Sequence, residues 1–147
     1  MGYKVITKAI VQRLKCVVPE LISPTQASFV PKWQIADNII IMQEILHTMH
    51  KKTCNIGWMA IKLDLKKHYD RLNWAFIQDT LQEMRLPQSF VEVIVRSITT
   101  CSMRILWNGE PTEQFFPKRG IRQGDPLSPH IIVACLERLA HLINEKV

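Results

Sequence analysis

Two polar segments of the sequence combine residue types that could carry out chemistry. The first, residues 62–71, reads Lys-Leu-Asp-Leu-Lys-Lys-His-Tyr-Asp-Arg and places two carboxylates, Asp64 and Asp70, on either side of Tyr69. Asp64 ends a stretch of alternating apolar residues, and the end of a strand is where a rigid sheet can hold a catalytic carboxylate open to a ligand. From the residues alone, a helix cap or an ion-pair partner explains this Asp about as often.

The second segment, residues 119–129, reads Arg-Gly-Ile-Arg-Gln-Gly-Asp-Pro-Leu-Ser-Pro. It supplies backbone amides, two arginines and a side-chain amide just before an expected helix. The N-terminus of a helix favours phosphate because its unpaired N–H groups and the helix dipole both attract negative charge. The segment therefore predicts a phosphate contact, with a solvated turn as the alternative interpretation.

Helices are expected to position both segments. Apolar residues at helical spacing predict helices over residues 4–18, 37–50, 73–86, 90–99 and from 128 onward. Pro19 should end the first helix, because a proline removes a backbone donor and crowds the preceding turn. Asp37, Asn73 and Ser128 are the expected N-caps. The first helix has its apolar positions at Val5, Ile6, Ala9, Ile10 and Leu14.

Two other regions alternate with the twofold period of a strand. Residues 58–65 predict a strand that carries Asp64 near its end. Residues 102–107 and 112–116 flank the pair Asn108-Gly109, which readily adopts the positive φ angles of a tight turn. We therefore expect a β-hairpin there.

Composition sets the class of protein. The chain has 147 residues, of which 47% are hydrophobic and 22% charged, so it can bury the core of one domain and does not have the composition of a disordered protein. No apolar run approaches the roughly 18 to 20 residues that cross a bilayer, and no secretory signal pattern is present. We expect an intracellular protein, nuclear or cytoplasmic, without membrane contact. The net charge of +6 is compatible with a polyanionic partner but does not identify one.

Together and in this order, the two segments resemble motifs A and B of reverse transcriptases, in the form typical of plant non-LTR (LINE-type) retrotransposons. Motif A covers residues 61–71 and motif B residues 118–129, and the string Arg119 to Pro129 is highly specific. The resemblance extends to residues 3–8, 13–15, 22–31, 37–38 and 106–109. It implies an α+β fold that forms part of the fingers and palm of a right-hand polymerase, with an RNA template, a DNA primer and a deoxynucleoside triphosphate as partners.

The resemblance also implies roles for individual residues. Polymerases of this family use two divalent ions to activate the primer oxygen and to neutralise the phosphate, and Mg²⁺ requires carboxylate oxygens and water. Asp64 would be the catalytic metal ligand, assisted by the backbone carbonyl of Leu65. The other implied roles are nucleotide binding by Tyr69, Arg122, Gln123 and Gly124, template or primer contact by Lys118 and Arg119, and fixing of the loops by Asp70 and Asp125.

Three departures from the family pattern bear on activity. His68 replaces a small Ala beside the aromatic Tyr69, where a larger ring should crowd the sugar pocket. Pro31-Lys32-Trp33 stands in place of Pro-Gly-Arg. Motif C, which supplies the remaining metal ligands as an Asp-Asp pair, should follow the last helix, and the five aspartates include no such pair.

We therefore expect residues 1–147 to be an incomplete reverse transcriptase domain that is inactive alone. Two alternatives stay open. One is a relic of a decayed element without a function. The other is a non-catalytic nucleic-acid-binding module that uses Lys62, Lys66, Lys67, Arg71, Lys118, Arg119 and Arg122.

Overall fold

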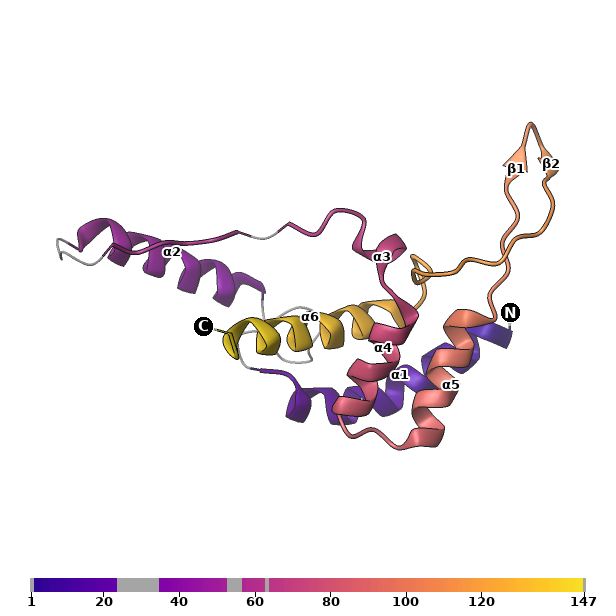
Figure 1. Cartoon of the computed structure of the whole chain (residues 1–147), viewed down its shortest axis with the longest axis horizontal. Coiled ribbons are helices and arrows are strands. Elements are labelled where there is room, and N and C mark those ends of the chain that lie inside the picture. Colours follow the sequence, from indigo (N-terminus) through magenta and orange to yellow (C-terminus); the bar gives the residue numbers. More distant parts are fainter. Residues whose placement is uncertain (1, 24–34, 53–56, 63, 147) are drawn as a thin grey trace.

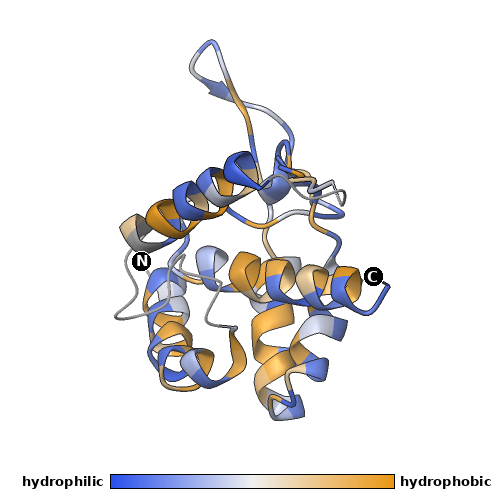
Figure 2. Cartoon of the chain, turned by 90° about the vertical axis from the view of Figure 1, so that its left-hand side faces the viewer, coloured by the Kyte–Doolittle hydropathy of each residue, from blue (hydrophilic) through white to orange (hydrophobic). Residues whose placement is uncertain are grey.

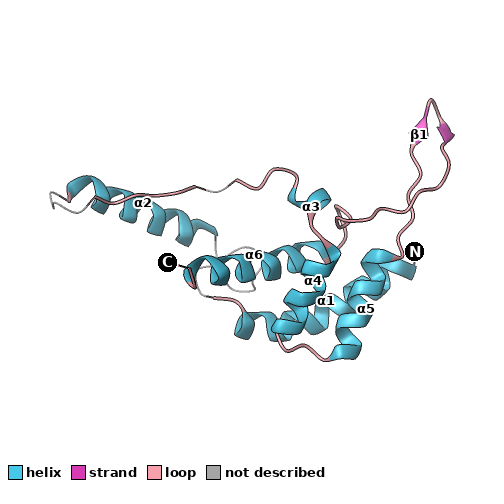
Figure 3. Ribbon diagram, viewed as in Figure 1, coloured by secondary structure: helices cyan, strands magenta, loops and turns pink. Residues whose placement is uncertain are grey.

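The computed structural model describes residues 2–23, 35–52, 57–62 and 64–146 of the chain. These residues form mainly helices, with one two-stranded antiparallel sheet (Figure 3). This content is compatible with part of a polymerase fold. The elements are α1 (Gly2–Leu21), α2 (Ile35–Lys51), α3 (His68–Arg71), α4 (Trp74–Glu83), α5 (Gln88–Thr99), β1 (Leu106–Trp107), β2 (Glu110–Pro111) and α6 (Ser128–Asn144).

The hydrophobic core lies where α1, α4, α5 and α6 come together (Figure 1). α5 contributes Val91, Ile94 and Ile98, whose three- and four-residue spacing places them on one face of the helix. α4 contributes Ile77 and Leu81. Ile77, Val91 and Ile94 are fully buried, so the centre of this core is closed to water.

Some of the helix ends follow local sequence signals. The side chain of Asn73 accepts a hydrogen bond from the Ala75 N–H at 2.9 Å and caps α4 as predicted. α5 begins directly after Pro87, close to the predicted boundary. α2 ends near His50 as expected, but it begins at Ile35, so Asp37 is not its N-cap.

The prediction for α1 was wrong in two respects. Pro19 does not end the helix, which continues to Leu21, and the Ile22 N–H still donates to the Val18 carbonyl at 3.0 Å. The buried face agrees with the prediction at Ile10 and Leu14, but Val5 and Ile6 are 66% and 55% exposed. Thr7, Val11 and Val18 complete the face that packs into the core. Both sets of positions have helical spacing, so the choice between them depends on the neighbouring helices.

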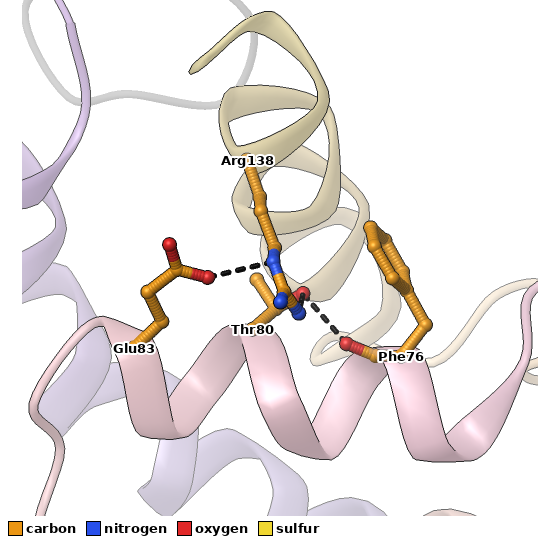
Figure 4. Close-up of polar contacts among 4 residues, drawn as sticks. All are labelled: Phe76, Thr80, Glu83 and Arg138. Carbon is orange, nitrogen blue, oxygen red and sulfur yellow. Dashed lines mark hydrogen bonds and ion pairs between the residues drawn. The ribbon is translucent and has the colours of Figure 1, made fainter. Parts of the chain in front are cut away.

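A polar cluster borders the contact between α4 and α6 (Figure 4). The Nε atom of Arg138 lies 2.6 Å from a carboxylate oxygen of Glu83, and its guanidinium carbon lies 5.0 Å from the centroid of the Phe76 ring. The buried Thr80 hydroxyl donates to the Phe76 carbonyl at 2.6 Å. Because the Glu83 side chain is 59% exposed, we expect its ion pair to contribute at most about 1 kcal/mol. Apolar burial therefore dominates this helix contact.

The expected strand over residues 58–65 is not formed in the described part of that segment, residues 57–62 and 64–65. Met59 and Ile61 are 81% and 70% exposed, because no described sheet covers this segment. A strand requires hydrogen bonds to a neighbouring strand, and no described residue supplies them to this segment. The prediction of a strand was therefore wrong for the described residues, because an alternating pattern cannot by itself provide the pairing strand.

α2 lies beside this extended segment and away from the core (Figure 1). Figure 2 colours several stretches of the α2 ribbon as hydrophobic. Those that are about half exposed are Ile39, Ile40, Ile41, Met42, Ile45 and Leu46. The Lys52 ammonium lies 3.9 Å from the centroid of the Trp58 ring, which ties the end of α2 to the extended segment. None of the described helices is both long and apolar enough to cross a membrane.

The predicted hairpin is present, but its strands are two residues long each, and the second lies at Glu110–Pro111 rather than within residues 112–116. Leu106 pairs with Pro111 and Trp107 with Glu110, and the connecting residues Asn108 and Gly109 have φ angles of 49° and 87°. These positive angles are the ones that a tight two-residue turn requires. The hairpin projects from the helical body and connects α5 to the motif B loop (Figure 3).

Candidate functional site

Backbone hydrogen bonds join the motif A segment to the motif B loop. The Gly120 N–H donates to the Leu72 carbonyl, and the Ile121 N–H donates to the Tyr69 carbonyl, both at 2.8 Å. The indole N–H of Trp74 donates to the Gly120 carbonyl at 2.7 Å. Although some 50 residues separate them in the sequence, the two segments therefore form one unit in space.

Gly120 makes this close approach possible. Its φ angle is +86°, a conformation that side chains rarely adopt, and an added Cβ would lie 2.9 Å from the Asp70 carbonyl oxygen and 3.0 Å from that of Tyr69. The backbone that Gly120 approaches closely is that of Tyr69 and Asp70 in the motif A segment.

Asp125 organises the motif B loop from inside. It is 6% exposed, and its carboxylate accepts a hydrogen bond from the Leu127 N–H at 3.0 Å, while its carbonyl accepts one from the Ser128 N–H at 3.2 Å. The hydroxyl of Ser128 donates across the loop to the Arg122 carbonyl at 2.6 Å. The prediction that Ser128 is the N-cap of the last helix was wrong, because α6 begins at Ser128 itself and this hydroxyl closes the loop.

The tip of the loop faces solvent. Arg122, Gln123 and Gly124 are exposed, and nothing lies within 4 Å of a Cβ added to Gly124. Lys118 and Arg119, just before the loop, are exposed as well. The loop thus combines a fixed interior with a polar, positively charged outer edge.

A cavity of about 180 Å³ lies beside the junction of the two motifs. Its lining includes Asp70 from the motif A segment, Arg119 and Arg122 from motif B, and Tyr3 from the first turn of α1. The base of the hairpin and the end of α5 complete the wall. A cavity with two guanidinium groups at its border can accept an anionic or a planar polar ligand.

Comparison with known proteins identifies the class of protein to which this arrangement belongs. Residues 1–147 match the family described as reverse transcriptase (RNA-dependent DNA polymerase). The chain is a member of the reverse transcriptase family.

Curated relatives agree with this assignment. The chain is 32% identical over 126 residues to the retrovirus-related Pol polyprotein from type-2 retrotransposable element R2DM of Drosophila melanogaster, a match that covers 84% of this chain and 12% of the relative. It is 30% identical over 147 residues to the transposon TX1 uncharacterized 149 kDa protein of Xenopus laevis, covering 99% of this chain and 11% of the relative. An uncharacterized mitochondrial protein of Arabidopsis thaliana is 51% identical over 35 residues, 24% of this chain and 29% of that protein. The chain thus spans only about a tenth of the length of the first two relatives, both of which come from transposable elements.

Asp64, which the resemblance to reverse transcriptases predicts to bind a metal ion, is exposed. The adjacent Leu65 carbonyl, the second expected ligand, lies 3.1 Å from the Nδ1 atom of His68. Within the described ranges, no cluster of three or more His, Cys, Asp or Glu residues could hold a metal ion. One exposed carboxylate and one hydrogen-bonded carbonyl do not make up a Mg²⁺ site, which requires several oxygen ligands in octahedral order.

Tyr69, the expected sugar-contacting residue, is half-buried against the core. The centroid of its ring lies 4.6 Å from that of His68, with an angle of 39° between the rings. The imidazole therefore occupies space next to the aromatic residue, where a small side chain was expected. The other departure, Pro31-Lys32-Trp33, lies outside the described residues.

Tyr3 belongs to this site although motif reasoning assigned it no role. It lies 119 residues before Arg122, yet the Arg122 guanidinium carbon is 5.6 Å from the centroid of its ring. The signal available in the sequence was its place at the start of residues 3–8, where the resemblance begins. A residue of the first helix is thus part of the wall around motif B.

Proposed function

We propose that this chain supplies the motif A and motif B portion of an RNA-directed DNA polymerase centre and binds the primer–template through the outer edge of motif B. The observation that carries the proposal is the pair of backbone hydrogen bonds from Gly120 and Ile121 to Leu72 and Tyr69. They fix the exposed Arg122 and Gln123 relative to Tyr69 in the second half of motif A, and a nucleotide-binding centre requires such fixed placement of its contacts.

The proposal separates binding from catalysis. Reverse transcriptases generally use divalent metal ions, and the described residues do not form such a site alone. We infer that a working centre needs carboxylates from outside these 147 residues. The function that the chain can carry out without them is electrostatic binding of nucleic acid through Lys118, Arg119 and Arg122. This non-catalytic role is the second candidate function, and the exposure of these three side chains favours it.

The source and setting are proposed on the same basis. The resemblance of residues 119–129 to plant LINE-type sequences and the short, 51% identical match to an Arabidopsis protein support an origin in a plant non-LTR element. We propose that the chain acts inside the cell, in the nucleus or cytoplasm, where an RNA template is present.

Binding to a labelled DNA primer annealed to a longer RNA template tests the proposed function. In a salt series followed by fluorescence anisotropy, the logarithm of the affinity should fall linearly with the logarithm of the salt concentration. Arg119→Gln should weaken binding, whereas Lys146→Gln should not, because Lys146 lies at the other end of α6 from the motif B loop. A folded wild-type protein that does not bind at low salt would contradict the proposal.

Primer extension tests the proposed lack of catalysis. The chain alone should add no nucleotide in the presence of Mg²⁺. Robust extension that is lost in Asp64→Ala would show that the 147 residues form a complete active site and would overturn this part of the proposal.

A further inference from the structure

Tyr3 is anchored where α1, α5 and the motif B loop meet. Its hydroxyl donates to the Ser97 carbonyl on α5 at 3.2 Å. Burial raises the pKa of this phenol, and the nearby Asp125 carboxylate raises the pKa further. The Tyr3 hydroxyl is therefore anchored to the end of α5, and the Asp125 carboxylate inside the motif B loop lies nearby.

The guanidinium of Arg122 lies over the ring of Tyr3. The guanidinium carbon lies 5.6 Å from the ring centroid, within the range at which a cation is attracted to an aromatic face. The Arg122 backbone is held independently, because its carbonyl accepts hydrogen bonds from the Ser128 hydroxyl at 2.6 Å and from the Asp125 N–H at 3.4 Å. Among the residues that the structure describes, no ion pair joins Arg122 to a carboxylate. The Tyr3 ring is thus the aromatic group that lies beside this guanidinium.

We propose that Tyr3 is a positioning residue. It holds the Arg122 guanidinium at the edge of the 180 Å³ cavity beside the junction of the two motifs, where the guanidinium can bind a nucleic-acid phosphate. The inference rests on the proposed function, because Arg122 is one of the residues proposed there to bind nucleic acid and Tyr3 is the residue that orients it. Arginine has several rotatable bonds, and an aromatic face restricts them while leaving the planar N–H groups free to bind. Arg119 borders the same cavity, but no aromatic contact orients it among the described residues.

Three substitutions separate this role from simple support of the fold. Tyr3→Phe removes the hydrogen bond to Ser97 and keeps the ring. Tyr3→Leu removes the ring. Arg122→Lys keeps the charge and loses the planar face while α1 stays unaltered, so it tests the same contact even if Tyr3→Leu fails to fold.

Affinity for the labelled primer–template across a salt series is the first measurement. We expect Arg122→Gln to lower the affinity several-fold and to reduce the slope of log affinity against log salt by about 0.7 to 0.9, the value of one phosphate contact. Tyr3→Leu and Arg122→Lys should each show most of the loss in affinity that Arg122→Gln shows, whereas Tyr3→Phe should stay within about twofold of wild type. The double variant Tyr3→Leu with Arg122→Gln should bind like Arg122→Gln alone. Wild-type affinity in both Tyr3→Leu and Arg122→Lys, or losses that multiply in the double variant, would overturn the inference.

A second measurement needs no nucleic acid. In an NMR spectrum, the side-chain Nε–H of Arg122 should show an upfield ring-current shift in wild type and Tyr3→Phe that disappears in Tyr3→Leu. If the shift is absent in wild type, Tyr3 does not hold Arg122 and the inference fails. If the shift is present but the wild type binds no primer–template, the proposed function fails separately.

Discussion

The segment around Asp64 and the loop around Asp125 are equally conspicuous in the sequence, yet they have opposite structural states. Asp125 is 6% exposed, and two hydrogen bonds join it to Leu127 and Ser128. Asp64 is exposed and follows an extended stretch whose Met59 and Ile61 face solvent. The loop closes with partners from its own next few residues, whereas a strand needs a partner from elsewhere in the chain. Local partners explain why the Asp125 carboxylate is held inside a loop and the Asp64 carboxylate is exposed.

The two regions meet at α3, and the hydrogen bonds from the motif B loop reach no further toward Asp64 than this helix. Gly120 and Ile121 bond to the carbonyls of Leu72 and Tyr69, so the second half of motif A shares the stability of motif B. The residues before α3 lie outside this contact. Three measurements can sharpen or break the contrast.

The largest effect is expected for Gly120→Ala. Its φ angle of +86° and a Cβ placed 2.9 Å from a backbone oxygen should together cost about 2 to 4 kcal/mol of the free energy of unfolding. The matched control is Gly57→Ala in the extended segment, where nothing lies within 4 Å of the added Cβ. Because alanine restricts the unfolded chain, we expect this control to be neutral or to stabilise by up to about 1 kcal/mol. Urea unfolding of both variants measures the difference, and equal losses would refute the contrast.

Asp125→Ala should come next. It removes a buried carboxylate that accepts the Leu127 N–H and leaves that donor unsatisfied, a loss of about 1.5 to 3 kcal/mol. Asp64→Ala should leave the unfolding midpoint close to that of wild type, because this carboxylate is exposed. Thermal unfolding by circular dichroism compares the two. A larger loss in Asp64→Ala would mean that the motif A segment is packed in solution.

The smallest effect concerns pH. Burial lowers the pKa of His130 in the first turn of α6, and the positive charge of Lys15 lowers the pKa further. As pH falls through about 6.5, the unfolded chain takes up a proton at this histidine before the folded chain does, so the free energy of unfolding should decrease. The loss should level off below the pKa of the folded state.

His130→Leu checks this assignment. The variant should show a smaller decrease in the urea midpoint than wild type between pH 7.5 and pH 5.5. If the decrease is the same in the variant, the group that titrates is not His130. That result would contradict the assignment of the pH dependence to burial of His130 in α6.

Several features could be read from sequence because neighbouring residues suffice to produce them. Asn73 caps α4 with its own side chain, Asn108-Gly109 makes the turn of the hairpin, and Pro87 separates α4 from α5. The string of residues 119–129 indicated the family, which the comparisons confirmed over residues 1–147. The same string placed the helix start near Ser128, although the role of the hydroxyl differed.

What could not be read depends on contacts between distant parts of the chain. Ile10 and Leu14 of α1 are buried as predicted, but packing against the other core helices buried Thr7 and Val11 beside them and left Val5 exposed. The alternation of residues 58–65 predicted a strand that the described residues do not form, because a strand exists only when another strand satisfies its backbone groups. The approach of Tyr3 to Arg122 arises because α1 and the motif B loop pack around the same core. Short-range hydrogen bonds and backbone preferences are written into neighbouring residues, whereas the buried face of a helix and the partner of a strand depend on which distant surfaces the folded chain brings together.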